Sequence, residues 1–222
     1  MKKTLITLLA SFFLFSTSYA IDYNIGVSGS IGLINAEGSE SETSNTGVEN
    51  SSRAKNVDNI AGIGSIFFDV GFDNGMRVGA SIVPMAADVS DKTHKRSDTS
   101  IATSGEGVTG TNTRTADAEV EKFRTFYLEY PLSGATFVKL GYSQIDVNTK
   151  ENNLTNGGKY KDATIDGVTF GLGLDGEIGG YFTRTSVEHT DFDEYAASSG
   201  TGNKITADLD VTEIKFSVGK TF

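Results

Sequence analysis

The C-terminal segment 212–222 alternates between apolar and polar side chains along most of its length. This period of two is typical of a β-strand with one apolar and one polar face. The pattern therefore predicts a strand that separates two different environments. The apolar positions are Ile214, Phe216, Val218 and Phe222, and the positions beside them carry Glu213, Lys215, Ser217, Gly219 and Thr221.

Eight segments have strand-like patterns, and the gaps between them alternate in length. Long loops at one end and tight turns at the other are typical of an antiparallel up-and-down transmembrane β-barrel. The sequence therefore predicts an all-β fold of this kind with eight strands. We expect strands over 23–34, 60–72, 76–85, 120–130, 136–147, 164–174, 177–189 and 205–222, long loops over 35–59, 86–119, 148–163 and 190–204, and turns over 73–75, 131–135 and 175–176.

The three turns predict how neighbouring strands are paired. Asp175-Gly176 suits a two-residue type I′ hairpin, and the turn 73–75 suits a three-residue hairpin with Gly75 in the left-handed conformation. All three keep apolar residues opposite apolar residues on one face. The expected pairs are Phe72–Met76 and Val70–Val78, Tyr130–Thr136 and Leu128–Val138, and Leu174–Glu177, Leu172–Gly179 and Phe170–Tyr181.

The alternation assigns each side chain to the outer or the inner face of the barrel. The outer face is apolar and suits contact with lipid, with aromatic residues near the short turns, as in an interfacial girdle. The predicted lipid-facing residues include Phe68, Phe126, Val138, Leu140, Phe170 and Phe216, and the expected girdle comprises Tyr23, Phe72, Tyr130, Tyr181 and Phe222.

The inner face is predicted to be small and polar, with balanced charges. The turn registers place Asp69 diagonal to Arg77 and Glu129 diagonal to Lys139. Unpaired charges in a narrow lumen would cost several kcal/mol each, so four acids and four bases predict a lumen filled by ion pairs. The predicted network comprises Asp69, Arg77, Glu129, Lys139, Arg184, Glu188, Glu213 and Lys215.

Residues 1–20 have the pattern of a cleaved signal peptide, so the barrel is expected to cover 21–222. Lys2 and Lys3 precede an apolar run, and Ser18 and Ala20 are small residues at the expected cleavage positions. The chain has no cysteine, which excludes a lipoprotein anchor and disulfides. Its net charge of -10, which would become -12 without Lys2 and Lys3, argues against nucleic acid as a partner.

The chain resembles the small outer-membrane barrels of the OmpA transmembrane-domain type, which include the OmpX/Ail and OmpW branches. The resemblance rests on the leader, the eight alternating segments, the loop asymmetry and the terminal Phe222. It implies a monomer in the cell outer membrane, in contact with lipopolysaccharide, with both termini periplasmic. It also implies an assembly signal of Phe222, Val218 and Phe216 for the barrel-assembly machinery, although Lys220 stands where an apolar residue is usual. The peptidoglycan-binding domain of OmpA has no counterpart here.

Several motifs have both a chemical and an ordinary structural explanation. Residues 171–176 match G-x-G-x-x-G, but a strand follows them instead of a helix, so we expect lumen-facing glycines. His94 is expected to be a solvated loop residue. Ser186 and His189 suggest a lipid hydrolase, yet residues three apart on a strand face opposite sides. We therefore expect no enzymatic activity.

Charged clusters in the predicted loops could bind ions. The acidic clusters could hold Ca²⁺ or Mg²⁺ through oxygen ligands, but neither has EF-hand spacing, so solvated charge is expected and no metal or cofactor is predicted. Lys122 and Arg124 face outward and could meet lipopolysaccharide phosphates or extend along the membrane interface. The acidic clusters are Glu37/Glu40/Glu42 and Asp191/Asp193/Glu194.

These observations predict a structural and surface-interaction role, in which acidic outer loops contact surfaces, host factors or phage. One alternative is a small-solute channel of the OmpW type, which a lumen filled by side chains disfavours. A second is an outer-membrane lipid hydrolase. A third is a soluble lipocalin-like barrel, which would require apolar residues inside.

Overall fold

The computed structural model describes residues 21–43, 49–85, 87–88, 94–101, 108–152, 160–198 and 204–222. The predicted signal peptide lies outside these residues. The described part of the chain is all-β, as the alternation predicted. No described residue belongs to a helix that is long and apolar enough to cross a membrane.

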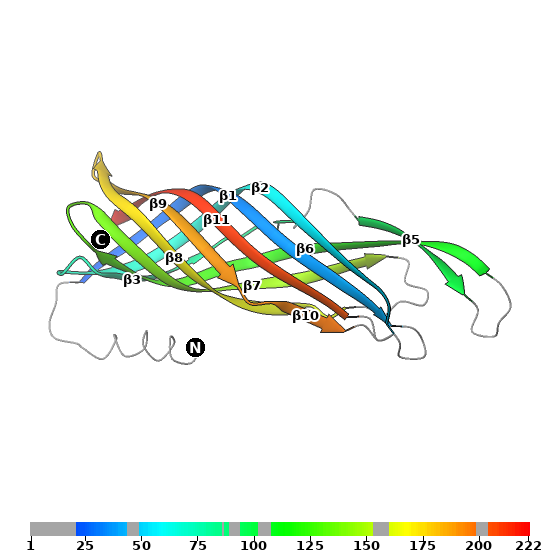
Figure 1. Cartoon of the computed structure of the whole chain (residues 1–222). Helices are drawn as coiled ribbons and strands as arrows, with labels where there is room; N and C mark the ends of the chain where they lie inside the picture. Colours follow the sequence, from blue (N-terminus) through cyan, green and yellow to red (C-terminus); the bar gives the residue numbers. More distant parts are fainter. Residues whose placement is uncertain are drawn as a thin grey trace.

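Eight antiparallel strands form a closed barrel (Figure 1). Consecutive barrel strands pair with each other, and β1 pairs with β11 from Asn24–Thr221 to Ser41–Lys204, which closes the sheet. The barrel strands are β1 (Ile21–Thr43), β2 (Glu49–Phe72), β3 (Arg77–Ile82), β6 (Val108–Pro131), β7 (Thr136–Asn152), β8 (Ala163–Ile178), β9 (Tyr181–Phe192) and β11 (Lys204–Thr221).

Large parts of the expected loops are paired strands, which corrects the prediction for 35–59, 86–119, 148–163 and 190–204. The β1–β2 ladder continues to Thr43–Glu49, and β5 (His94–Ile101) pairs with the first part of β6. These long strands project beyond the barrel (Figure 1). In sequence, these segments are polar at most positions, so neither face of the strand is apolar. The alternation of apolar and polar residues that predicts a strand is therefore missing there. The short β4 (Ala87–Asp88) and β10 (Tyr195–Ser198) pair with β6 and β11.

The turn 73–75 has the predicted form. Phe72 and Met76 are hydrogen-bonded across it, Val70 pairs with Val78, and Gly75 has a φ of 78°.

The other two turns differ from the prediction. The β8–β9 hairpin turns at Gly179-Gly180, whose φ values of 60° and 81° satisfy the type I′ requirement, and not at Asp175-Gly176. Pro131 stays in β6, so that turn narrows to 133–135 around Gly134. The observed pairs are Leu174–Thr185, Leu172–Val187, Phe170–His189, Tyr130–Val138 and Leu128–Leu140. Both shifts are by an even number of residues, so each side chain keeps its predicted face.

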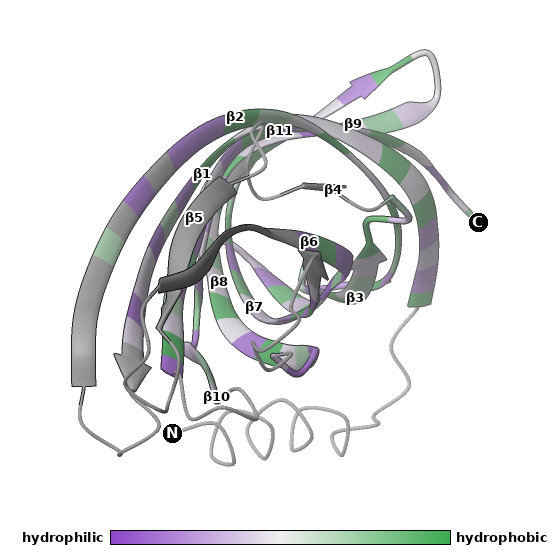
Figure 2. Cartoon of the chain, turned by 90° about the vertical axis from the view of Figure 1, so that its right-hand side faces the viewer, coloured by the Kyte–Doolittle hydropathy of each residue, from purple (hydrophilic) through white to green (hydrophobic). Residues whose placement is uncertain are grey.

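An apolar band surrounds the outer face of the barrel. The strands wrap around a central space, and hydrophobic and hydrophilic residues alternate along them (Figure 2). Among the predicted lipid-facing residues, Phe68, Phe126 and Phe170 are about half exposed, at 46%, 51% and 56%. Leu140 and Phe216 are also exposed, whereas Val138 is half-buried.

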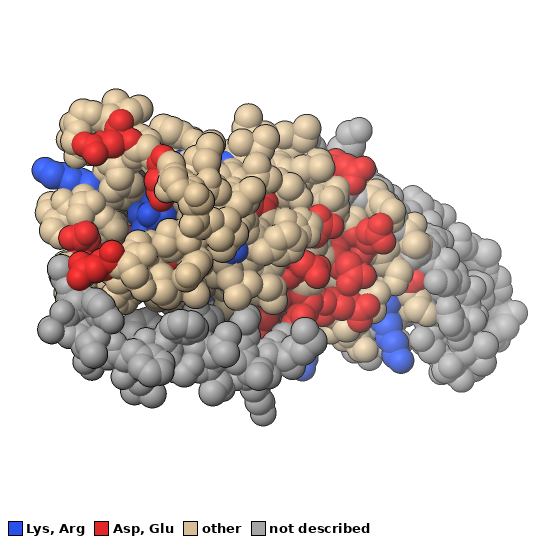
Figure 3. All heavy atoms as spheres, turned by 60° about the vertical axis from the view of Figure 1, so that its left-hand side comes forward, with Lys and Arg blue, Asp and Glu red and all other residues tan. Residues whose placement is uncertain are grey.

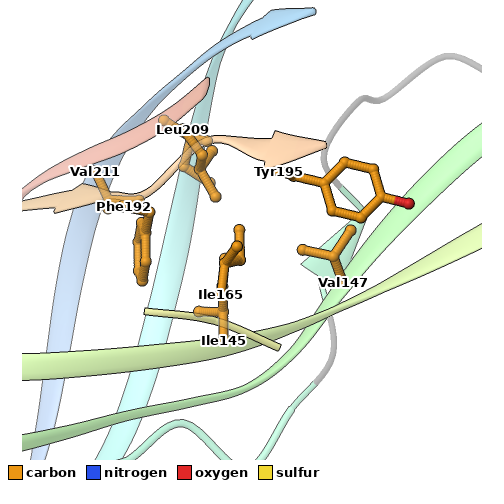
Figure 4. Packing of buried hydrophobic residues seen from close by; sticks show 8 residues of the cluster. Ile145, Val147, Ile165, Phe192, Tyr195, Leu209 and Val211 are labelled. Carbon is orange, nitrogen blue, oxygen red and sulfur yellow. The ribbon is translucent and has the colours of Figure 1, made fainter. Parts of the chain in front are cut away.

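The inner face has two layers, and only the layer near the short turns is polar. Further from these turns, the lumen contains a hydrophobic core (Figure 4). The prediction of a small and polar interior is therefore wrong for this half. The core consists of Ile34, Ile145, Val147, Ile165, Phe192, Tyr195, Leu209 and Val211.

We predict that Gly26→Val destabilises the closed barrel. A Cβ at Gly26 would lie 2.5 Å from the carbonyl oxygen of Val218, on the closing strand β11. Overpacking of this kind costs about 1–3 kcal/mol, and more where backbone must move. Urea unfolding in detergent, followed by heat-modifiable gel mobility, measures the loss. Gly29→Val is the control, because a Cβ at Gly29 meets nothing within 4 Å; equal stability of the two variants would contradict the prediction.

Candidate functional site

The half of the lumen near the short turns is filled by a chain of ion pairs that we call the plug. Arg77 Nε lies 2.7 Å from Glu129, and Lys139 Nζ lies 4.0 Å from Glu129 and 2.9 Å from Glu188. The chain continues through Lys215, which lies 2.9 Å from Glu188. The plug comprises the eight predicted charged residues together with Asp175.

Arg184 and Asp69 form a second branch of the plug. Its guanidinium donates to Asp69 and lies 5.4 Å from the ring centre of Phe67 and 4.5 Å from that of Phe182. The Tyr127 hydroxyl also donates to Asp69, at 3.0 Å. Asp69 is fully buried, so these donors replace the water that its charge would otherwise require.

The structure brings the predicted charges together but replaces one of the two expected pairs. Asp69 pairs with Arg184 instead of Arg77, and Arg77 pairs with Glu129 and with Asp175 at 3.0 Å. The expected pair of Glu129 and Lys139 is present, but the two residues lie directly opposite each other and not diagonal, because the turn at 133–135 moved the register. Asp175 was not predicted as a plug residue because Asp175-Gly176 suits a tight turn.

A row of buried hydroxyl groups lies beyond the plug. Thr125 and Ser143 are 2.8 Å apart, Ser143 and Thr169 are 2.6 Å apart, and Thr169 and Thr190 are 2.7 Å apart. These four residues belong to the neighbouring strands β6, β7, β8 and β9. We call them the hydroxyl row; it separates the ionic part of the lumen from the hydrophobic core.

The hydrophobic half of the lumen contains a cavity of about 90 Å³, which we call the apolar pocket. Phe123 and Phe192 meet edge to face at its wall, with ring centres 5.6 Å apart. Its lining is almost entirely hydrocarbon: Ile34, Ala61, Gly62, Ile63, Gly64, Val83, Met85, Val120, Phe123, Ile145, Phe192, Leu209 and Val211.

The apolar pocket is lined in part by the portion of β2 that lies beyond its ladder with β3. This ladder ends at Ile66–Ile82, and no other described strand pairs with this edge of β2. Gly62 and Gly64, which line the pocket, continue the outward-facing series of β2, and a Cβ at either would meet open space. Met85, which also lines the pocket, is 61% exposed. We call the part of the wall between this edge of β2 and Met85 the side opening.

A β-bulge lies beside the side opening. Lys122 has a φ of 51°, which is uncommon for a residue other than glycine, and the β6–β7 register shifts between Glu121 and Arg124. On the outer face, Lys122 Nζ lies 3.2 Å from Asp146. The Thr164 hydroxyl also donates to Asp146, at 2.7 Å.

Acidic side chains gather on one part of the outer surface (Figure 3). Glu37 lies opposite Asp208 on adjacent strands, and Asp191 lies opposite Asp210. None of these four forms an ion pair with a described residue. Like charges in cross-strand pairs are destabilising. The predicted acidic clusters form no group of three metal-ligating residues within the described part of the chain, and the side chain of Glu42 lies outside it.

The residues of the proposed hydrolase do not meet. Ser186 is buried inside the barrel and donates to Glu188, whereas His189 lies on the outer face against Phe170 and Thr212. The side chain of His94 lies outside the described residues. Gly171 and Gly173 face the lumen within β8 and touch other side chains, as expected for the G-x-G-x-x-G match.

The residues of the expected assembly signal lie at the closing ladder. Phe216 and Phe222 are exposed on the outer face, and Val218 pairs with Val27 of β1. The nitrogen and carbonyl oxygen of Phe222 bond to Tyr23, so the two described ends of the chain meet at the end with the short turns. Recognition of these residues by the barrel-assembly machinery stays a prediction.

Comparison with known proteins identifies the fold. No protein-family model and no curated protein sequence matches the chain. The similar solved structures include the outer membrane protein OprG from Pseudomonas aeruginosa, with 17% identity, a TM-score of 0.51, and 90% of this chain and 96% of that chain covered.

Two other similar structures are the outer membrane protein AlkL, solved in DMPC lipid bilayers (14% identity, TM-score 0.41, 93% of each chain), and Ail of Yersinia pestis, solved with the heparin analogue sucrose octasulfate (12%, 0.33, 86% of this chain and 98% of that chain). At these identities the similarity concerns the fold. The chain has the fold of the small eight-stranded outer-membrane barrels, as its sequence pattern predicted.

We predict that Glu188→Gln destabilises the barrel by about 3–5 kcal/mol, because it removes the shared partner of two buried lysines. Urea unfolding in detergent measures this change. The matched control is Glu177→Gln in the same hairpin, where the side chain is exposed and a change within about 0.5 kcal/mol is expected. Similar losses in both variants would show that the plug contributes no specific stability.

We predict that Asp191→Asn stabilises the barrel by about 0.2–1 kcal/mol at low salt, because it removes the repulsion from Asp210. The gain should vanish at roughly 1 M salt, where the screening length falls to about 3 Å. Urea unfolding at the two salt concentrations measures both effects. A gain that is independent of salt would contradict the electrostatic explanation.

Proposed function

We propose that this protein is an outer-membrane β-barrel that exchanges small apolar molecules sideways between its apolar pocket and the surrounding bilayer. The observation that carries this proposal is the side opening, where a hydrocarbon-lined pocket is bordered by an edge of β2 with which no described strand pairs. The proposal modifies the small-solute channel that the sequence left as an alternative to a structural and surface-interaction role. It replaces passage along the barrel axis with passage through the wall.

The outer face supports the membrane location. Large apolar side chains are exposed on every long barrel strand, which a soluble barrel would bury, so we set aside the lipocalin-like alternative. Tyr23, Tyr130 and Tyr181 lie near the ends with the short turns and are about half exposed, as in an interfacial girdle. We propose that this end faces the periplasm and that the projecting strands face outward.

Side chains in both halves of the lumen block passage along the barrel axis. The plug and the hydroxyl row fill the lumen toward the short turns, and the hydrophobic core fills it toward the projecting strands. Moving charged groups aside would break buried ion pairs, which costs several kcal/mol. The side opening requires no such change.

The chemistry of the pocket suits exchange instead of storage. Lipid tails are about as apolar as the pocket lining, so a hydrocarbon gains little free energy by moving from one to the other. The cavity of about 90 Å³ is smaller than a cavity of roughly 150 Å³ that holds benzene, so it encloses only part of a small ring or alkyl chain, and the rest of the ligand lies in the side opening.

The projecting strands support a second candidate function, which is interaction at the cell surface. The β1–β2 and β5–β6 hairpins extend beyond the apolar band, and their sequences are rich in polar residues. Rigid scaffolds commonly carry binding residues on such extensions. We propose that lipopolysaccharide and host, surface or phage ligands would meet the protein there. We also propose that the protein is a monomer without enzymatic activity, since Ser186 and His189 lie on opposite faces.

We predict that Gly62→Leu, alone or with Gly64→Leu, slows exchange of a small apolar probe between the bilayer and the pocket by about tenfold, which corresponds to a barrier higher by about 1.4 kcal/mol. The new side chains would cover the side opening without meeting other atoms. Exchange of fluorobenzene between the protein and the lipid of vesicles can be followed by ¹⁹F NMR.

Gly29→Leu is the control for these variants, because Gly29 is also an exposed glycine with open space around it but lies away from the pocket lining. Slower exchange in Gly29→Leu, or exchange at the wild-type rate in Gly62→Leu, would contradict the proposed route.

A further inference from the structure

We infer that Phe123 sets the length and polarity of the molecules that the apolar pocket accepts, and that the bulge at Lys122 positions it. The inference rests on the proposed function, because it concerns the ligand of the same pocket. It assigns a specificity role to Phe123 and a positioning role to Lys122.

Phe123 stands between the apolar pocket and the hydroxyl row. It lines the pocket and meets Phe192 edge to face, with ring centres 5.6 Å apart. Two residues further along the same faces of these strands lie Thr125 and Thr190, at the two ends of the hydroxyl row. The rings of Phe123 and Phe192 therefore separate the apolar pocket from the hydroxyl row. Without them, hydroxyl groups would line this end of the pocket.

The hydroxyl row is suited to a further polar partner. Its four hydroxyl groups can donate four hydrogen bonds, but only three bonds join them. One of the four donors is therefore left over. A ligand that reached the row could accept a hydrogen bond there, so the ring pair now excludes ligands with a polar end.

The position of Phe123 is fixed by the bulge, by a backbone hydrogen bond and by an ion pair of its neighbour Lys122. Lys122 and Phe123 together lie opposite Ile145, since Arg124 pairs with Gln144 and Glu121 pairs with Asp146. The carbonyl oxygen of Phe123 accepts a bond of 2.8 Å from the Val83 nitrogen, at the end of β3 beside the side opening.

On the outer face, the ion pair between Lys122 and Asp146 anchors the strained residue. A non-glycine residue keeps a positive φ only where its surroundings enforce it. Bulges commonly redirect a neighbouring side chain, which here is Phe123.

Deletion of Lys122 is a direct test of this role. On the β7 side the register would become regular, with Phe123 opposite Ile145 and Glu121 still opposite Asp146, so the residues of β6 and β7 would keep their faces. On the other side of β6, the stretch between its ladders with β3 and β4 would be one residue shorter. Lys122→Gly is the conservative variant, because glycine adopts a positive φ without cost and preserves the bulge.

The experiment compares two ¹⁹F NMR probes in protein-containing vesicles: fluorobenzene, which is small and apolar, and 6-fluoro-1-hexanol, which is longer and ends in a hydroxyl group. The readout is the ratio of their affinities, which does not depend on the amount of folded protein. Phe123→Ala should raise the ratio in favour of the alcohol by about fivefold, an effect of about 1 kcal/mol. Deletion of Lys122 should shift it in the same direction, and Lys122→Gly should restore the wild-type ratio.

The control is Phe126→Ala, which removes an outward-facing ring on the same strand and should leave the ratio unchanged. Phe123→Leu replaces Phe123→Ala if heat-modifiable mobility shows that the alanine variant does not fold. An unchanged ratio in the Phe123 variant overturns the specificity role. An unchanged ratio after deletion of Lys122, or a shift of equal size in Lys122→Gly, overturns the positioning role. A wild-type protein that binds neither probe overturns the proposed function itself.

Discussion

Backbone hydrogen bonding is the constraint on which the rest of the structure depends. A polar backbone group left unpaired in hydrocarbon costs several kcal/mol, so a sheet that spans a membrane must close on itself. The β1–β11 ladder provides this closure. The side opening is the place where the ladder between neighbouring strands is interrupted, and it coincides with the pocket. Irregular backbone at this depth is tolerated where it lines a cavity.

Closure also decides what the interior contains. An eight-stranded barrel leaves room for its own side chains and at most one small ligand. Near the short turns these are charged residues whose partners lie on neighbouring or facing strands, such as Lys139 and Glu188. Further along the axis they are aliphatic and aromatic. The same cylinder therefore has one half that is closed by electrostatic pairing and one half whose packing leaves a space for a ligand.

The period of the side chains made much of this structure predictable. Alternation defines the face of each residue whatever its partners are, which is why the charges of the plug could be named from the sequence. The register between β8 and β9 could not be predicted, because Asp175-Gly176 and Gly179-Gly180 both suit a tight hairpin. Tertiary packing determines which of them forms the turn. The apolar pocket was missed because residues such as Ile34 and Ile145 interrupt the polar inner series only near the strand ends. The bulge at Lys122 has no sequence signal, since lysine does not favour a positive φ.

The distribution of the plug residues over β2, β3, β6, β7, β8, β9 and β11 has a consequence for the order of biogenesis. A partly formed sheet with one ladder missing would expose lysine, arginine and carboxylate groups to acyl chains, which is energetically costly. The inner surface must therefore remain hydrated until the final edges join. Insertion and closure are thus expected to be a single concerted step, with stable half-barrels in the bilayer excluded by the charges that later hold the finished cylinder together.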